Sequence, residues 1–129
     1  MATRITQKAE KRAANKDKRP YAKAKYVRMS SSKVNIVLDQ IRGKKVTVAL
    51  SMLEIMTDSA AKECFKVLSS AIANAENNKG MNRETLVVAE CYTGNAPMLK
   101  RVSFRGRGGV DTIQKKSTHI TIILDEIGG

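Results

Sequence analysis

Tryptophan is absent from this 129-residue chain, which has only two phenylalanines, three tyrosines, two cysteines and one histidine. The scarcity of rings predicts an aliphatic core and argues against a ring-lined pocket for a small ligand. Cys64 and Cys91 lack CxxC spacing, which excludes a disulfide framework and a zinc site, and we expect each to be a small apolar core residue. His119 has no second His and no close Cys partner, so the chain offers no metal centre or nucleophile–base pair. We therefore expect no enzyme and no cofactor.

Long apolar runs are also missing. No stretch approaches the roughly 18 apolar residues of a membrane span, and the first residues lack the apolar run of a secretory signal. The glycine-rich segment 105–109 lacks the GxxxxGK[ST] pattern and does not open a helix, so it does not predict a nucleotide site. These absences predict a soluble, cytoplasmic protein.

Basic residues are abundant and unevenly placed. The formal net charge is +12, with eleven basic and two acidic residues in 1–33, seven of each in 34–99, and six basic against three acidic in 100–129. A charge needed only for solubility rarely segregates in this way. An anionic membrane is a weaker partner, because the cations of residues 8–19 have no large apolar side chains among them to insert into lipid. The pattern favours a globular body with two basic ends that bind nucleic-acid phosphates.

The order of the segments predicts an α+β fold, with a small antiparallel sheet packed with three helices, a long protruding β-hairpin and a basic N-terminal tail. Residues 1–19 have no apolar face and are expected to be disordered or weakly helical when free. Residues 20–129 are expected to form a single domain. Its predicted elements are an edge strand at 21–29, helices at 31–42, from a Thr47 cap to Met56, and from an Asp58 cap to 77–80, a central strand at 84–92, a turn at 93–97 and a hairpin at about 97–124.

The hairpin is the strongest functional signal. Its turn reads Arg-Gly-Arg-Gly-Gly-Val-Asp over 105–111, and six basic residues but one acidic residue lie between Lys100 and Ile120. An isolated two-stranded ribbon is marginal in water, and this one also repels itself. A polyanionic partner would neutralise the charge and supply the missing packing.

Folded RNA fits this pattern better than DNA does. The chain shows no helix-turn-helix, zinc finger or aromatic platform for unpaired bases, whereas basic arms and a thin ribbon suit the irregular clefts of folded RNA. An architectural DNA-binding protein of the nucleoid is the alternative, although such ribbons usually carry an apolar wedge at their tips, where this chain has only Val110. An RNA-processing enzyme would need catalytic residues that the chain lacks.

Three motifs carry a family resemblance: Ser-Ala-Ile-Ala-Asn-Ala-Glu-Asn at 70–77, Ile-Arg-Gly-Lys at 41–44 and Lys-Ser-Thr-His-Ile-Thr at 116–121. With these motifs in order, the chain resembles the bacterial large-subunit ribosomal protein twenty-two family from about Lys23 to Asp125. The resemblance implies a structural component of the large ribosomal subunit, located in the cytoplasm. It further implies that the protein binds large-subunit ribosomal RNA, supports assembly of the subunit and lines the polypeptide exit tunnel with its hairpin tip. The implied partners are that RNA, neighbouring large-subunit proteins and the nascent polypeptide, with no membrane and no DNA.

The resemblance also implies site residues. Lys23 and Lys25 enter the set from the basic face of the first predicted strand. The expected RNA-binding residues are Lys23, Lys25, Arg28, Ser30, Lys33, Arg42, Lys44, Lys100, Arg101, Arg105, Arg107, Lys115, Lys116 and His119. The expected tunnel-lining tip is Arg105, Gly106, Arg107, Gly108, Gly109, Val110 and Asp111. The chain departs from the family pattern at Asn35, Phe104, Gly109 and Thr112, and the missing tip charges at the last two should weaken phosphate anchoring there.

Overall fold

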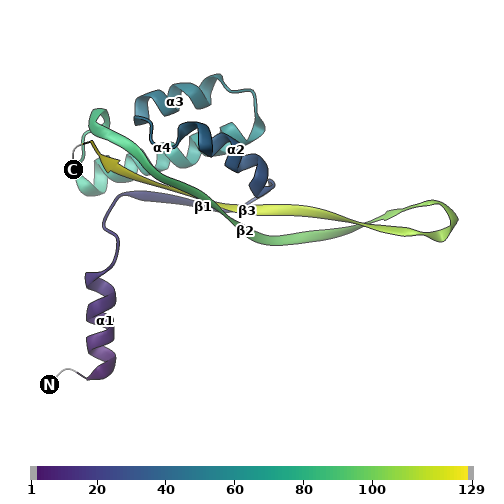
Figure 1. The fold of residues 1–129 in the computed structure, drawn as a ribbon, viewed down its shortest axis with the longest axis horizontal. Helices are drawn as coiled ribbons and strands as arrows, with labels where there is room; N and C mark the ends of the chain where they lie inside the picture. The colour runs from purple at the N-terminus through teal and green to yellow at the C-terminus, as the bar shows by residue number, and fades with distance from the viewer. Residues whose placement is uncertain (1–2, 128–129) are drawn as a thin grey trace.

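A computed structural model describes residues 3–127, so residues 1–2 of the predicted tail and residues 128–129 of the predicted domain lie outside the described residues. The helices are α1 (Arg4–Ala14), α2 (Ser31–Ile41), α3 (Val46–Ile55) and α4 (Ser59–Lys79), and the strands are β1 (Tyr21–Val27), β2 (Leu86–Phe104) and β3 (Val110–Glu126). Short 3-10 turns occupy Arg83–Thr85 and Gly106–Gly108. The antiparallel sheet has the order β1-β3-β2, with α2, α3 and α4 on one face and the β2–β3 hairpin extending far beyond them (Figure 1). The predicted α+β architecture is confirmed.

The three body helices form where apolar residues recur at helical spacing. In α2 the buried side chains are Val34, Val37, Leu38 and Ile41, which is the predicted stripe. Helix α4 has Asp58 at its N-cap position and ends at Gly80, whose left-handed conformation at φ 63° suits a residue without a Cβ atom.

The predicted start of α3 was wrong by two residues, because the N-cap residue is Lys45 and not Thr47. Thr47 does not cap the helix, because α3 already begins at Val46, which is fully buried in the core. The Thr47 carbonyl instead accepts a hydrogen bond from the Ser51 hydroxyl at 3.1 Å, one turn further along. Burial of Val46 therefore decides where the helix begins.

Strand β3, and not the predicted strand at 84–92, is the centre of the sheet. Ile120, Ile122 and Leu124 of β3 are fully buried beneath the helices, and β1 and β2 flank β3 on its two edges. Residues 86–92 of the predicted strand instead supply the start of β2, which is an edge strand, whereas residues 84–85 belong to the 3-10 turn Arg83–Thr85. The near-continuous apolar run 120–124 is typical of a strand with neighbours on both sides.

The predicted turn at 93–97 is also wrong, because β2 runs through it. Gly94 pairs with His119, Asn95 with Thr118 and Ala96 with Ser117. Pro97 falls in the register shift between Ala96 and Leu99, where the missing N–H removes no ladder hydrogen bond. The body strand and the hairpin arm are therefore one strand of 19 residues.

Both cysteines are buried and unpaired, as predicted. Burial raises the pKa of the Cys64 thiol to about 12, and it also raises the pKa of Cys91. Cys91 Sγ lies 3.4 Å from the Leu38 carbonyl oxygen, to which it donates. The two thiols are therefore core residues of low reactivity.

Candidate nucleic-acid interface

The outer half of the hairpin, residues 97–116, packs on no other part of the chain that the structure describes. Within this distal hairpin every residue is exposed except Ser103, which is half-buried. The strands remain paired from Leu99–Lys115 to Phe104–Val110, and at about 3.4 Å per residue Phe104 lies roughly 27 Å beyond Ala96. The exposed cations of this segment are Lys100, Arg101, Arg105, Arg107, Lys115 and Lys116.

Each face of the distal hairpin mixes cations with exposed apolar side chains. Register places Arg101, Ile113 and Lys115 on one face. Lys100, with the Phe104–Val110 pair, lies on the other, where Phe104 is 85% exposed. This pair gives the tip more apolar surface than Val110 alone, which the sequence analysis missed. Both faces are left for contact with a partner.

The tip holds one ion pair and one unpaired cation. Arg105 Nε donates to the Asp111 carboxylate, and the Arg105 amide donates to the Gly109 carbonyl at 2.8 Å. Arg107 sits at φ 59°, a left-handed conformation that costs a non-glycine residue about 1–2 kcal/mol, and it has no ion-pair partner among residues 3–127. Because the only tip carboxylate pairs with Arg105, the Arg107 guanidinium remains available for a phosphate.

Residues far apart in the sequence meet in a groove at the base of the hairpin. This basal groove, of about 380 Å³, is lined by Arg28, Met29, Ser30, Lys33, Ser59, Ala60, Gln114, Lys115 and Lys116. Arg28 Nη1 donates to Ser117 Oγ at 3.4 Å, which links the β1–α2 connection to β3. Five of the predicted RNA-binding residues are thus brought together, with four cations around one hollow.

His119 and Lys25 lie where β1 bulges away from β3. Tyr26 has φ 58°, and the register of β1 shifts between Ala24 and Val27. The Tyr26 amide donates to His119 Nδ1 at 3.0 Å, and the two rings meet edge to face at 4.9 Å. His119 is therefore a half-buried strand residue that holds the bulge, with Nε2 left as a donor, and Lys25 is exposed within the bulge.

Lys23 lies on the sheet face that the helices leave open. Its ammonium is 5.5 Å from the centre of the Tyr21 ring. Lys23 and Tyr92 both pair with Thr121, one from each side of β3, so Tyr92 lies on the same face of the sheet as Lys23. Tyr21 and Tyr92 are 46% and 47% exposed. The sequence pattern places Tyr21 on the same basic strand face as Lys23, but it missed Tyr92 as a surface residue, although strand alternation with the buried Cys91 was the signal that could have found it.

Arg42 and Lys44 lie apart from the basal groove, around the end of α2. Arg42 donates to Asp39 Oδ1 at 2.6 Å and to the Cys91 carbonyl at 2.8 Å, and the hydrogen bond to Asp39 raises the pKa of Arg42. The Lys44 carbonyl accepts from the Val88 amide at 2.9 Å, while its side chain is exposed. Arg42 therefore joins α2 to β2 in addition to presenting charge.

A clip formed by Arg19 was not predicted. Arg19 Nη2 lies 2.6 Å from Asp17 Oδ2 and 3.0 Å from Glu90 Oε1, so it ties the N-terminal linker to β2. The hydrogen bonds from Arg19 lower the pKa of Asp17 to about 2. A contact across 71 residues has no signature in the local sequence.

The pKa of Asp17 makes the clip pH-dependent. The pKa of Asp17 in the folded protein lies below the ordinary 3.8. The ion pair between Asp17 and Arg19 is therefore fully formed above about pH 4 and is lost as the pH falls towards 2. An NMR titration of the Asp17 carboxyl carbon should show a midpoint near pH 2 in the intact chain. In Arg19→Gln the midpoint should rise towards 3.8, and an unchanged midpoint would show that Arg19 does not cause the shift.

Within residues 3–127 no group of three or more His, Cys, Asp or Glu side chains is placed to hold a metal ion. No helix in the same range is long and apolar enough to cross a membrane. What the described surface presents is an assembly of cations, exposed rings and a projecting ribbon, an arrangement suited to contacting phosphates.

Comparison with known proteins shows that most of the chain, including most of the residues of this surface, matches a protein family. Residues 22–125 match the model described as "Ribosomal protein L22p/L17e". Three similar curated proteins each carry the name "Large ribosomal subunit protein uL22". The one from Lachnoclostridium phytofermentans is 49% identical over 115 residues, covering 89% of this chain and 90% of the relative. The one from Acaryochloris marina is 51% identical over 104 residues, which cover 81% of this chain and 87% of the relative. The one from Clostridium acetobutylicum is 50% identical over 103 residues, which cover 80% of this chain and 93% of the relative.

Proposed function

This chain belongs to the ribosomal protein L22p/L17e family, and from that premise we propose that its distal hairpin and basal groove bind large-subunit ribosomal RNA. The resemblance to the protein twenty-two family is thereby confirmed. Family membership makes the chain a structural, non-enzymatic component of the large ribosomal subunit, and the ribosome its location. The RNA contacts and the position of the hairpin tip are the proposal.

The observation that carries the proposal is the exposure of the distal hairpin. Residues 97–116 include six exposed cations and one acid, and no other part of the described chain covers them. A free ribbon of this kind is marginal in stability, whereas RNA phosphates would neutralise it and release bound counterions. The basal groove extends the same charge onto the body, through Arg28 and Lys33.

The reach of the hairpin supports a position for its tip deep inside the particle. A ribbon that extends roughly 27 Å past the body can pass between RNA segments while the body stays on the surface. We propose that residues 105–111 line the polypeptide exit tunnel and face the nascent polypeptide there. By joining RNA segments along its length, the hairpin would also support assembly of the subunit.

Crosslinking tests the proposal in cells. Ultraviolet crosslinking followed by sequencing should place crosslinks from residues 105–116 on large-subunit ribosomal RNA, and the chain should co-sediment with large subunits in equal amount. Recovery mainly in DNA-containing fractions, with dispersed crosslinks, would overturn the proposal and favour the architectural DNA-binding alternative.

The tip can be tested separately with Arg105→Ala combined with Arg107→Ala. Hydrogen exchange at the amides of residues 100–115 should become faster in large subunits that contain the variant, because both cations of the tip are lost, together with the ion pair between Arg105 and Asp111. The melting temperature of the free protein should stay unchanged. A lower melting temperature would show instead that the tip packs on its own domain.

A further inference from the structure

Helix α1 carries its cations on one face. At 100° per residue, Arg4, Lys8, Lys11 and Arg12 fall within an arc of about 100°, while Ala13 lies on the far side of the helix. The helix begins with a side-chain cap, in which Thr3 Oγ1 accepts from the Thr6 amide at 3.4 Å, and none of its residues is buried. Residues 4–14 of the predicted tail thus form a helix in this structure, and this helix offers a basic stripe to solvent.

Among residues 3–127 this stripe has no neutralising ion-pair partner. Lys8 has a like charge four residues away in each direction, at Arg4 and Arg12, and such pairs destabilise a helix. The only acidic residue of the helix, Glu10, lies away from the stripe, and no ion pair joins it to the stripe. An 11-residue helix without tertiary packing is marginal in water. A polyanion laid along the stripe would remove the repulsion and stabilise the helix.

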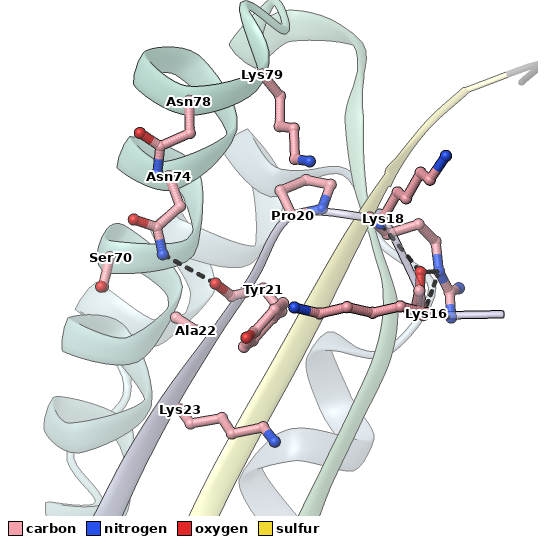
Figure 2. Close-up of a pocket in the computed structure, with 12 residues that line it drawn as sticks. Lys16, Lys18, Pro20, Tyr21, Ala22, Lys23, Ser70, Asn74, Asn78 and Lys79 are labelled. Carbon is pink, nitrogen blue, oxygen red and sulfur yellow. Dashed lines mark hydrogen bonds and ion pairs between the residues drawn. The ribbon is translucent and has the colours of Figure 1, made fainter. Parts of the chain in front are cut away.

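The linker after α1 leads into a second basic groove. This arm groove, of about 490 Å³, lies between the linker, β1 and the C-terminal half of α4, with Lys16 and Lys18 on one side and Asn74 and Lys79 on the other (Figure 2). Its lining also includes Lys23, Ser70 and Asn78. Ammonium, amide and hydroxyl groups are the donors that contact phosphate and sugar oxygens in nucleic-acid complexes.

Two contacts hold the arm groove in place. The Arg19 clip ties the linker to Glu90 of β2, and Asn74 Nδ2 donates to the Tyr21 carbonyl at 2.9 Å, which ties α4 to β1. Pro20 between them is buried. The linker therefore leaves the body at a fixed point, and α1 stands off the body at the opposite end of the long axis from the hairpin tip (Figure 1).

We propose that the basic stripe of α1 and the arm groove form a second RNA-binding surface, which takes the sugar-phosphate backbone of an RNA segment distinct from the one around the hairpin. The inference rests on the proposed function, since it assigns a further contact to the same RNA. Helix α1 and the linker lie outside the range 22–125 that matches the family, so they would add to the RNA contacts proposed for the family body. The occupant is RNA because the surface is rich in cations and short donors, with Ile5 the only large apolar side chain of the helix.

The test compares two full-length variants of equal charge. Arg4→Gln/Lys8→Gln/Lys11→Gln/Arg12→Gln removes the stripe. The control, Lys45→Gln/Lys62→Gln/Lys66→Gln/Arg83→Gln, removes four exposed body cations outside both proposed surfaces. Affinity for purified large-subunit ribosomal RNA from the source cells is measured between 50 and 400 mM salt. The stripe variant should bind about tenfold more weakly, with a salt slope smaller by roughly 2 to 4, and the control should stay close to wild type.

The outcomes distinguish a failure of the proposed function from a failure of the inference alone. Wild-type protein that fails to bind the RNA would overturn the proposed function and the inference together. Wild-type binding with equal losses in the two variants would overturn the inference alone, because total charge would then explain the effect. In isolated large subunits, a photoreactive side chain replacing Ile5 should crosslink to RNA, and a crosslink confined to protein would show that the arm docks on a protein instead.

Discussion

Replacing residues 97–116 with the two-residue turn Asn-Gly should abolish stable incorporation into large subunits while the body stays folded. The deletion removes six cations and one acid but no residue of the helix-covered core, because the Ala96–Ser117 pair marks the end of the buried sheet. Affinity for large-subunit ribosomal RNA should fall by tenfold or more, and the salt slope by roughly 4 or more. Gradient sedimentation of cell extracts and circular-dichroism melting of the free protein measure the two effects.

A charge-only variant shows what the ribbon contributes by its shape. Lys100, Arg101, Arg105, Arg107, Lys115 and Lys116 are all replaced by Gln, which keeps the length of the hairpin. We expect this variant to bind RNA as weakly as the deletion and to melt at the wild-type temperature. If the deletion lowered the melting temperature by ten degrees or more, the distal hairpin would belong to the cooperative fold of the body.

Ile122→Ala should lower the free energy of unfolding by about 2–5 kcal/mol, whereas Ile113→Ala should lower it by less than about 1 kcal/mol. The two isoleucines lie on the same strand, but Ile122 is fully buried under the helices and Ile113 is 42% exposed in the distal hairpin. A total stability of about 5–15 kcal/mol is usual for a domain, so the first loss is a large fraction of it. Urea denaturation of the two variants measures the difference, and equal losses would contradict the separation of core and ribbon.

The sequence predicted the helices of the body well, because their signals are local. Apolar spacing in α2 and the left-handed glycine after α4 depend on residues within a turn or two of each other. It failed at the sheet because strand order depends on which residues meet across the fold. Gly94, Asn95 and Pro97 are typical of a turn, yet their segment pairs with β3, whose arrangement is not visible locally.

The candidate site divides in the same way. Exposure of the hairpin followed from its composition, but Arg28 and Lys116 are 88 positions apart, and only the fold shows that they line one groove. Their place in the expected set came from the family resemblance. The Arg19–Glu90 ion pair and the hydrogen bond from the Tyr26 amide to His119 also join residues far apart in the sequence, so no spacing rule could have found them.

The central position of β3 sets an order of events during synthesis. Residues 110–126 are made after α2 and α4, yet these two helices pack their apolar faces against β3, where Ile120, Ile122 and Leu124 are fully buried. Strand β1 has no partner other than β3 within the sheet, so it cannot pair until β3 has been synthesised. Until β3 emerges, the growing chain exposes apolar surface and unpaired strand edges, a state prone to aggregation. Folding of the body is therefore a late and nearly all-or-none event, completed only when the middle of the sheet arrives.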